Sequence, residues 1–533
     1  MRIKCWLSDS LTRWFPLSKP SGQKLLRLDA ARGERVSFQA NLFLENPGPV
    51  DVSLTAQGPK DVEVTVRRVG CVPVPHHNTE IPAEVLDGVG HIPGYVPDPL
   101  FEESNAVAAP REVTSFWITV KIPPNAKPGV KKARLSLKGP EGAAIPLTAE
   151  IRISPVAIRR PREFRVIHFF YADALCDWYK VEPFSAAFWP IAEKYFRNYT
   201  AHGCDVMYVP AFTPPLDGVK RVTQLLGVKK LAKGRYEFNW RLVKRWVDLA
   251  KICGVRDFSW VHLFTQWGCK NAIRIYHGHG LDERLLWPIE TPAASRTYRN
   301  FLVQYLGELE RFLRRENIFD VSHFSVSDEP HGDEQLESYR KARAMLREIA
   351  PWMKTMDALS DIRFARMKLV DTPVPMISTA RQFVEEGIPC WTSFCCYPRG
   401  KYANRFLDTP LARTRMLGWL FYRFGFQGFL HWGYNYWYKS QTRQLIDPFT
   451  VTDGLRWPVW AYGDTSVVYP GPAGPIDSIR WEVFADSLQD YALLETLGVE
   501  RAGALLRPLR DFNAFPSPKT WIAAARRKLL FQE

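Results

Sequence analysis

Hydrophobic and polar residues alternate along most of the first 160 residues. The alternation is clearest in residues 35–44, where Val36, Phe38 and Leu42 share one parity. Similar apolar runs cover residues 50–54, 62–66, 116–120, 133–137 and 147–153. Because neighbouring side chains of a strand point to opposite faces, these runs predict strands. Turn residues such as Asn46-Pro47-Gly48-Pro49 separate them, so we predict an all-β sandwich domain over residues 1–160.

A Pro-rich stretch, residues 71–113, interrupts this alternation. It reads as irregular, and a loop of such length usually has a function, so we expect it to reach over a neighbouring domain. Residues 154–161 are basic and flanked by prolines. We therefore predict that they link the β domain to a second domain over residues 161–533.

In the second domain, short apolar runs alternate with stretches of helical periodicity. The predicted strands are residues 165–171, 206–210, 258–264, 322–327, 355–359, 374–379, 390–397 and 428–432. The predicted helices are residues 185–201, 239–254, 295–316, 333–350, 409–424 and 476–496, with Asn239 as an N-cap. Eight such units predict a (β/α)8 TIM barrel that includes the C-terminal helices. A doubly wound sheet is the competing fold, but no Gly-rich phosphate loop opens the first unit.

Two adjacent carboxylates, Asp328 and Glu329, end the fourth predicted strand and precede Pro330. Proline favours extended geometry in the residue before it, so we expect Glu329 at the open end of the strand. In a parallel α/β barrel, that end carries the chemistry. The alternative is a polar turn that merely closes the strand.

Polar and aromatic residues also follow the other predicted strands, whose ends would converge in a barrel. The predicted substrate-binding residues are His262, Asp357, Tyr397, Tyr402, Asn404, His431, Trp432, Asn435 and Trp437. Rings that stack on a sugar, beside amides and carboxylates that bind hydroxyls, would form a carbohydrate pocket. Any one of these residues could instead be structural, so the hypothesis rests on their convergence. The many aromatic residues could likewise fill a large core.

Glycosidic cleavage needs an acid for the leaving oxygen and a group that stabilises the positively charged sugar ring. Most glycosidases use two carboxylates about 5 Å or more apart across the bond. Adjacent strand residues point to opposite faces, but a bulge or a strand end lets them share a site. That arrangement suits a substrate-assisted route, in which the 2-acetamido oxygen attacks the anomeric carbon. Asp328 would orient the acetamido N–H, and Glu329 would protonate the leaving oxygen and then activate water.

Charge and cysteine content narrow the function classes. The net charge is +15 and the pI about 9.3, but the charge is spread and no nucleic-acid-binding motif is present. Nine cysteines without regular spacing favour a reducing compartment, and His277-Gly-His279 has no further ligands at metal spacing. No signal peptide or apolar run of about 18 residues is visible. We expect a cytoplasmic protein with a carbohydrate substrate, no membrane span, no nucleic acid, no metal and no cofactor.

Several segments together resemble glycoside hydrolase family 123, whose members include β-N-acetylgalactosaminidases. They are Ser327-Asp-Glu-Pro330, Cys395–Asp408, His431–Trp437, Tyr469-Pro-Gly-Pro472, Ser478–Glu482 and Asp490-Tyr491, and the resemblance covers about residues 165–500. It implies a retaining, acetamido-assisted mechanism whose Asp-Glu pair maps onto Asp328 and Glu329. Arg480 and Glu482 also belong to it, either as catalytic residues or, as we favour, as structural ones.

The sequence therefore predicts a retaining, exo-acting glycoside hydrolase for terminal β-N-acetylgalactosamine. The alternatives are a glycosidase with another sugar specificity and a barrel that binds carbohydrate without catalysis. Binding of nucleic acid through the positive charge is a further hypothesis, which a steep salt dependence would support.

Overall fold

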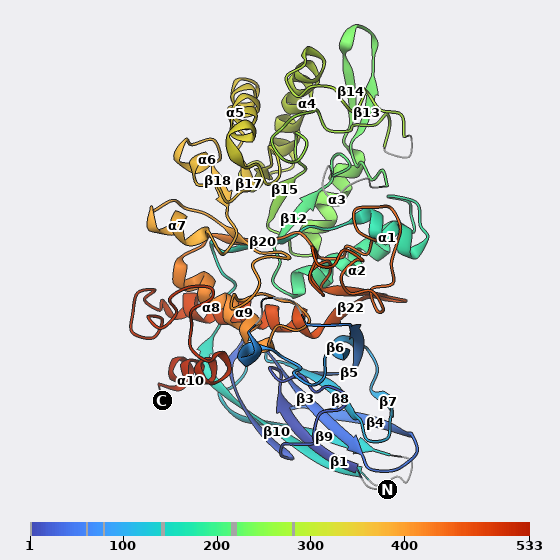
Figure 1. The fold of residues 1–533 in the computed structure, drawn as a ribbon, viewed down its shortest axis with the longest axis vertical. Coiled ribbons are helices and arrows are strands. Elements are labelled where there is room, and N and C mark those ends of the chain that lie inside the picture. The colour runs from blue at the N-terminus through green and yellow to red at the C-terminus, as the bar shows by residue number, and fades with distance from the viewer. Residues whose placement is uncertain are drawn as a thin grey trace.

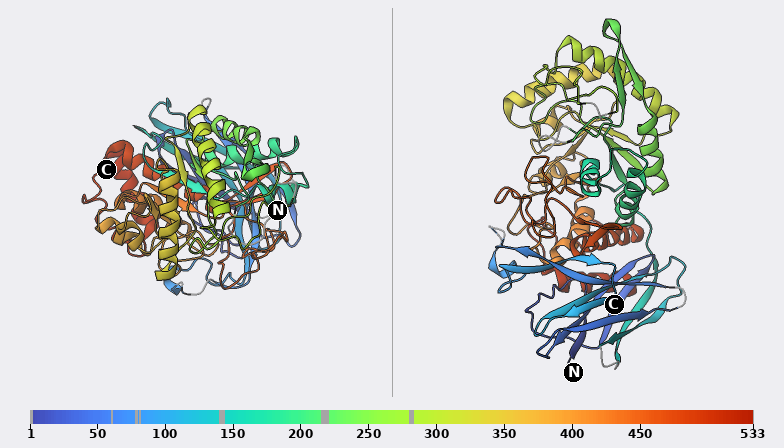
Figure 2. Two further views of the ribbon diagram at one scale, coloured as in Figure 1. Left: turned by 90° about the horizontal axis from the view of Figure 1, so that it is seen from above. Right: turned by 90° about the vertical axis from the view of Figure 1, so that its right-hand side faces the viewer.

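The computed structural model of the protein describes residues 3–59, 62–77, 80, 82–139, 144–214, 221–279 and 283–532. A β-rich region built mainly from the N-terminal residues lies at one end of the molecule, and a mixed α/β region forms the rest (Figure 1). The same division is visible from a second direction (Figure 2).

The N-terminal region contains ten strands: six overlap the predicted apolar runs, whereas the first two, the sixth and the seventh were not predicted. They are β1 Ile3–Asp9, β2 Leu25–Arg32, β3 Arg35–Leu44, β4 Val50–Gln57, β5 Glu63–Val74, β6 Gly94–Phe101, β7 Asn105–Ala108, β8 Val113–Lys121, β9 Gly129–Lys138 and β10 Ala144–Ala157. One sheet has the order β1-β3-β8-β5-β6-β22-β21, and the other has the order β2-β10-β9-β4-β7. Buried side chains of both sheets, among them Phe38, Phe116 and Leu135, form one shared core.

The Pro-rich stretch of residues 71–113 is more regular than predicted. Strand β6 pairs antiparallel with β5, and β7 pairs antiparallel with β4. Between β5 and β6, the described residues hold a short 3-10 helix, η1 (Ala83–Val85). The expected reach over the neighbouring region is present there, because the backbone N–H of Asp87 donates to the carbonyl of Asp408 (3.3 Å). The expected irregularity is wrong for β6 and β7, since the two prolines of β6 leave enough partners for sheet pairing and β7 contains no proline.

All eight strands predicted for the second region are present, although each is shorter than predicted. They are β11 Arg165–His168, β12 Val206–Val209, β15 Asp257–Trp260, β16 Ser322–Phe324, β17 Met356–Ala358, β18 Thr372–Val374, β19 Thr392–Ser393 and β20 Gly428–His431. They form parallel ladders in the orders β12-β15-β16, β17-β18 and β11-β20-β19. Single parallel bridges, Phe324 to Thr355 and Met376 to Ser393, connect these ladders.

Together, the ladders and bridges give the neighbour order β12-β15-β16-β17-β18-β19-β20-β11. The order would become a closed circle if its two ends, β11 and β12, also paired. The backbone N–H of Asp205 donates to the carbonyl of Val166 (3.1 Å), but the two strands share no ladder in the described residues. The region is therefore a mixed α/β fold with eight parallel strands in cyclic order, and a closed barrel stays a prediction.

Helices follow each of the eight strands, whereas the sequence predicted a helix in six of the eight units and none after β17 and β18. They are α1 Ala172–Tyr179, α2 Phe188–Ala201, α3 Arg241–Ile252, α4 Arg296–Arg315, α5 Gly332–Ile349, α6 Arg363–Arg366, α7 Ala380–Glu385, α8 Leu411–Phe424, α9 Ile479–Leu497 and α10 Pro518–Phe531. A hairpin of β13 (Gly227–Lys230) and β14 (Tyr236–Asn239), with the 3-10 turn η2 (Ala232–Gly234), precedes α3. Asn239 ends β14 and Trp240 caps α3, so the predicted cap is off by one residue. None of the described helices combines the length and apolar character that a membrane crossing requires.

The two regions share a sheet as well as a surface. Strands β21 (Val468–Gly471) and β22 (Gly474–Ser478) come from late in the chain, yet β22 pairs with β6. Beside this junction, the buried Arg480 guanidinium binds Asp98 (Nη2 to Oδ2, 2.9 Å), and Glu482 binds Arg67 (2.8 Å). Arg480 and Glu482 thus connect α9 to the N-terminal sheet, which agrees with a structural role. The predicted boundary near residue 160 separates the two regions along the chain, but strands from both sides of that boundary pair in this sheet.

Candidate active site

The backbone turns sharply at the two adjacent carboxylates. The ladder of β16 ends at Phe324, and Glu329 has a φ of 45°. The extended conformation predicted for Glu329 is therefore wrong. Its N–H donates to the carbonyl of Ala358 after β17 (3.0 Å), and this tertiary hydrogen bond fixes a conformation that the local preference before proline disfavours. Positive φ is uncommon for residues other than glycine and often marks functional sites.

Both carboxylates line one cavity of about 220 Å³ at the carboxyl ends of the strands. Asp328 is half-buried and Glu329 is exposed. The other lining residues come from the ends of β17, β19 and β20 and from the segments after β11, β15, β18, β19 and β20: Phe169, Gln266, Trp267, Ala358, Met376, Ser393, Phe394, Cys395, Cys396, Leu430, Trp432, Gln441, Arg456, Val459 and Trp460. The strand end and the turn thus allow consecutive residues to share one site.

The loop after β15 fixes the position of Asp328. The Gln266 amide donates from Nε2 to the Asp328 carboxylate (3.0 Å), and the Trp267 N–H donates to the Asp328 carbonyl (3.0 Å). Asp328 is therefore oriented as an acceptor at the edge of the cavity, whereas Glu329 extends toward solvent.

Asp357 holds the backbone that follows β16 in place. Its carboxylate is buried and accepts hydrogen bonds from the Val326 N–H (2.9 Å) and the Tyr339 hydroxyl (2.5 Å). Burial raises the pKa of Asp357 to about 7, and these hydrogen bonds oppose the rise only in part. Asp357 is absent from the cavity lining and instead holds the backbone that leads to Asp328.

An aromatic wall faces the carboxylates. The Trp432 indole donates from Nε1 to Asp464 (2.8 Å), and its ring lies 5.2 Å from the Trp460 ring. The Arg456 guanidinium lies over Trp460 at 5.0 Å, while Trp267 is 52% exposed. Fixed rings beside carboxylates and amides suit a sugar, because the ring faces are apolar and the hydroxyl groups need polar partners.

Among the nine predicted substrate-binding residues, Trp432 lines this cavity and the other eight lie outside its lining. Besides Asp357, four of these are buried and bonded to the protein. His431 accepts a hydrogen bond from the Gly433 N–H at Nδ1, and Asn404 donates to the carbonyls of Cys395 and Pro398. Asn435 bridges the N–H and carbonyl of Tyr171, and the Trp437 indole donates to the Val468 carbonyl. These contacts hold the four side chains inside the protein, outside the cavity lining.

The remaining predicted residues have different surroundings. His262 is buried behind Phe169, with ring centroids 6.3 Å apart, and burial lowers its pKa to about 3. Tyr397 is exposed and lies against the Arg399 guanidinium, which is 4.5 Å from its ring. Tyr402 lines a separate small cavity together with Asn404. A role of these residues in substrate binding stays a prediction.

Several cavity residues were missed by the sequence reasoning. Trp460 and Arg456 belong to the long segment between β20 and β21, where no periodic signal marks them. Gln266 lies in the loop after β15, beside Trp267. Cys395 and Cys396 open the segment Cys395–Asp408 of the family resemblance, but that pattern alone gave no position relative to Glu329.

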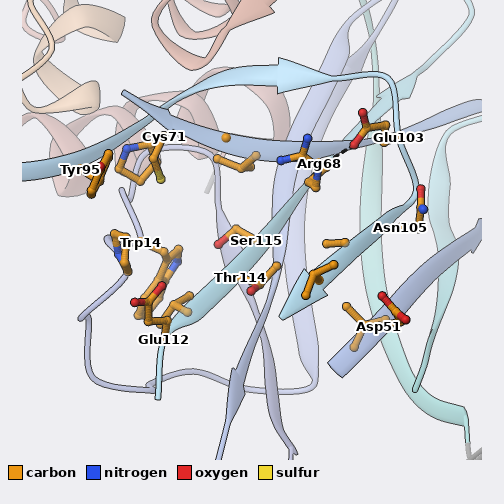
Figure 3. A pocket seen from close by; sticks show the side chains of 18 residues that line it. Trp14, Asp51, Arg68, Cys71, Tyr95, Glu103, Asn105, Glu112, Thr114 and Ser115 are labelled. Carbon is orange, nitrogen blue, oxygen red and sulfur yellow. Dashed lines mark hydrogen bonds and ion pairs between the residues drawn. The ribbon is translucent and has the colours of Figure 1, made fainter. Parts of the chain in front are cut away.

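A larger cavity of about 720 Å³ lies between the two N-terminal sheets. In Figure 3, Trp14 and Tyr95 lie toward one end, and Asp51 and Asn105 lie toward the other. It contains neither Asp328 nor Glu329. The larger cavity has carboxylates of its own, Asp51, Glu103 and Glu112, so the predicted acid pair, Asp328 and Glu329, is what makes the smaller cavity the candidate active site.

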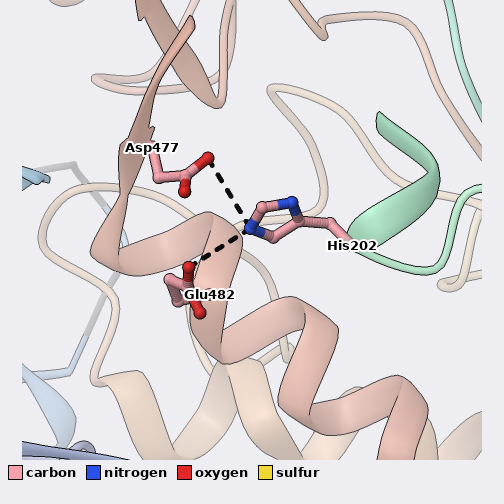
Figure 4. A group of neighbouring side chains, drawn as sticks. All are labelled: His202, Asp477 and Glu482. Carbon is pink, nitrogen blue, oxygen red and sulfur yellow. Dashed lines mark hydrogen bonds and ion pairs between the residues drawn. The ribbon is translucent and has the colours of Figure 1, made fainter. Parts of the chain in front are cut away.

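One group of side chains has the spacing of metal ligands: His202 at the end of α2, Asp477 on β22 and Glu482 on α9 (Figure 4). His202 Nε2 lies 3.3 Å from Glu482 and 3.6 Å from Asp477. Arg67 already binds both carboxylates, at 2.6 Å to Asp477 and 2.8 Å to Glu482. A cation would have to displace this guanidinium, so the group fits a structural ion-pair network better than a metal site.

Comparisons with known proteins place the chain in a family. The model of the glycoside hydrolase 123 catalytic domain matches residues 169–497, whereas the comparison with curated proteins found no match. A family 123 glycoside hydrolase from Clostridium perfringens, described in a structural study of glycolipid glycan hydrolysis, has a similar fold. Its TM-score is 0.74 at 14% identity, with 93% of this chain and 89% of the other covered.

Two further solved structures are much less similar. A Bacteroides ovatus GH5 xyloglucanase has a TM-score of 0.31 at 9% identity, with 91% of this chain and 100% of the other covered. A β-D-glucuronidase of Dictyoglomus thermophilum has a TM-score of 0.33 at 12% identity, with 90% and 72% covered. The family model spans more than half of the chain and includes both cavity carboxylates, so the chain belongs to glycoside hydrolase family 123.

Proposed function

We propose that the protein is a retaining, exo-acting β-N-acetylgalactosaminidase that uses the 2-acetamido group of its substrate as the nucleophile. Membership of family 123 supports hydrolysis of glycosidic bonds in a carbohydrate substrate. The observation that carries the finer proposal is the placement of Asp328 and Glu329, which are consecutive in sequence and line the same cavity.

In this mechanism, the two carboxylates have different roles because their surroundings differ. Asp328, held by Gln266, accepts the acetamido N–H and increases the electron density on the acetamido oxygen. That oxygen attacks the anomeric carbon and forms a cyclic oxazoline as the aglycone leaves. Glu329 is exposed, so it can reach the leaving oxygen, donate its proton and then take a proton from the attacking water.

Two inversions at the anomeric carbon give net retention. The acetamido oxygen approaches from one face of the sugar, and water later approaches from the opposite face. No carboxylate of the protein needs to form a covalent bond, which is consistent with the adjacency of Asp328 and Glu329. The wall of Trp432 and Trp460 would exclude water from the sugar's apolar face.

The proposed architecture is a closed (β/α)8 barrel domain over residues 161–533, preceded by a β-sandwich domain over residues 1–160. The cyclic order of the eight parallel strands supports the barrel, and the core shared by two sheets supports the sandwich. A location in the cytoplasm also stays a prediction.

The test uses the whole chain and three para-nitrophenyl glycosides: the β-N-acetylgalactosaminide, the β-N-acetylglucosaminide and the plain β-galactoside. We expect release from the acetamido sugars alone, fastest for the galactosaminide, and a β-anomer as the first product in NMR spectra. Glu329→Gln should lower kcat by about 10²- to 10⁴-fold, the usual contribution of a general acid. Glu334→Gln is the matched control, since Glu334 is an exposed carboxylate in the first turn of α5.

Each part of the proposal has its own contradicting result. Release from the plain galactoside would exclude the acetamido route, because that sugar has no acetamido oxygen. Unchanged hydrolysis by Glu329→Gln would exclude Glu329 as the acid. Glycan binding without product would favour the alternative of a non-catalytic binding protein.

A further inference from the structure

Two neighbouring cysteines face the same cavity as the proposed catalytic carboxylates. Cys395 and Cys396 directly follow β19, and both line the cavity that contains Asp328 and Glu329. Their sulfurs are 3.7 Å apart, the one cysteine–cysteine contact recorded within the described residues. Both residues are partly exposed, whereas Cys176, Cys204 and most other cysteines are buried.

The backbone holds this pair in a fixed turn. The Cys395 N–H donates to the Tyr397 carbonyl (2.9 Å), which closes the turn. The Cys395 carbonyl accepts from the Asn404 amide (3.1 Å), and the Cys396 carbonyl accepts from Arg399 Nε (2.9 Å). Asn404 and Arg399 are both buried. The two sulfurs are therefore presented together, with little conformational entropy left to lose on binding a ligand that bridges them.

We propose that Cys395 and Cys396 form a bidentate thiol site, open to the catalytic cavity, for trivalent arsenicals that carry one organic substituent. Such a ligand needs two sulfur atoms and no third protein donor. A structural zinc ion normally takes four ligands, and among the described residues no His or carboxylate forms a metal-ligand group with these sulfurs. Thiolate sulfur is a soft ligand, which favours soft acceptors over Mg²⁺ or Ca²⁺.

The binding step is a condensation without a change of oxidation state. An arsenoxide R–As=O reacts with both thiols, two As–S bonds form, and the oxygen leaves as water with the two thiol protons. The hydrogen bond with Cys396, together with burial, raises the pKa of the Cys395 thiol well above its usual value. Cys395 therefore holds its proton near neutral pH, and the protons of both thiols end in the water that the reaction forms.

Binding should also stop hydrolysis, because the arsenic and its substituent would occupy the cavity beside Glu329. This inhibition rests on the proposed function, whereas the binding itself does not. The thiol site therefore predicts two separate observations, a covalent adduct and a loss of turnover.

The experiment treats the whole chain with phenylarsine oxide and follows its intact mass and its hydrolysis of the para-nitrophenyl acetamido sugars. We expect one adduct, at least tenfold slower hydrolysis, and reversal by the dithiol 2,3-dimercaptopropanol but not by excess 2-mercaptoethanol. Cys395→Ser and Cys396→Ser should each lose the adduct that survives the monothiol. Cys71→Ser, which removes an exposed single cysteine on β5, should change neither the adduct nor the inhibition.

Peptide mapping of the wild-type adduct locates the arsenic without any variant. An adduct on residues 395–396 supports the site, whether or not the protein hydrolyses the test sugars. An adduct elsewhere, or none, overturns it. If the pair carries the adduct but hydrolysis is unchanged, the proposal that the thiol site opens into the catalytic cavity is overturned. An adduct on a chain that hydrolyses none of the sugars supports the thiol site and counts against the proposed function.

Discussion

The contact between the two regions should depend strongly on one buried ion pair, Asp98 with Arg480. Both side chains are at most 1% exposed, and Arg480 donates from Nε and Nη2 to the Asp98 carboxylate at 2.9–3.1 Å. Asp98 also accepts from the Tyr469 hydroxyl (2.6 Å). Asp98→Asn keeps the shape of the side chain but removes its charge, so the guanidinium would stay buried without a counter-ion.

The size of the expected loss of stability depends on the hydrogen bonds that Arg480 keeps in the variant. Removing one partner of a buried ion pair typically costs about 3–5 kcal/mol. Arg480 still donates to the carbonyls of Arg405, Gly463 and Ser466. Because these dipoles partly compensate the charge, we expect a loss near the lower limit, about 3 kcal/mol. Asp98 holds the pKa of Arg480 above its ordinary value despite burial. A guanidinium keeps its proton in proteins, so the arginine stays charged in the variant and cannot escape this loss.

Urea unfolding, followed by tryptophan fluorescence, would measure this loss. The matched control is Glu63→Gln, which breaks an exposed pair with Lys121 in the same sheet (2.7 Å; 51% and 59% exposed). An exposed pair contributes about 0–1 kcal/mol, so the control should unfold almost as the wild type does. Equal effects of the two substitutions would refute the reasoning, because burial is the difference between the pairs.

Two further predictions concern the cavity, beside those for Glu329 and the thiol pair. Because burial raises the pKa of Asp357 from 3.8 to about 7, folding disfavours its ionised form. Stability should therefore fall as the pH rises through this range, by about 4 kcal/mol in total. The Asp357→Asn variant should not show this loss of stability with rising pH. If the difference in unfolding free energy between the wild type and the variant is constant from pH 4 to 8, the prediction is wrong. Gln266→Ala removes the hydrogen bond to Asp328, which is worth about 1.5 kcal/mol, and should therefore slow hydrolysis about tenfold. The control Glu334→Gln should not slow hydrolysis. Equal hydrolysis rates of Gln266→Ala and the wild type would show that Gln266 does not contribute to the site.

Local patterns predicted most elements because burial imposes them on each segment separately. The alternation of β3 and the helical periodicity of α4 follow from one buried face, and the structure has β3 at the predicted bounds and α4 within one residue of them at each end. The predicted acid pair also lies in a cavity at the end of a strand, since Asp328 and Glu329 follow a short apolar run. The strand β6 was missed because its four-residue apolar signal is diluted by two prolines.

The lining of the cavity could not be predicted in the same way. Asn435 and Trp437 follow a strand and have suitable side chains, yet both are buried and bonded to backbone groups of the protein. Trp460 and Gln266 carry no local signal, but the packing of distant segments places them beside the carboxylates. Residue type indicates what a side chain can bind, whereas its direction depends on neighbours far away in the sequence.

The sequence by itself determined most of the strands and helices in their order, the family resemblance and the acid pair. These depend on residues that are close together in the chain. Tertiary structure decided the conformation of Glu329, because its N–H is bonded to Ala358 and this bond outweighs the preference imposed by Pro330. It also decided that β22 extends the N-terminal sheet and that two thiols face the carboxylates. Such contacts join residues tens to hundreds of positions apart, and only the packed chain brings them together.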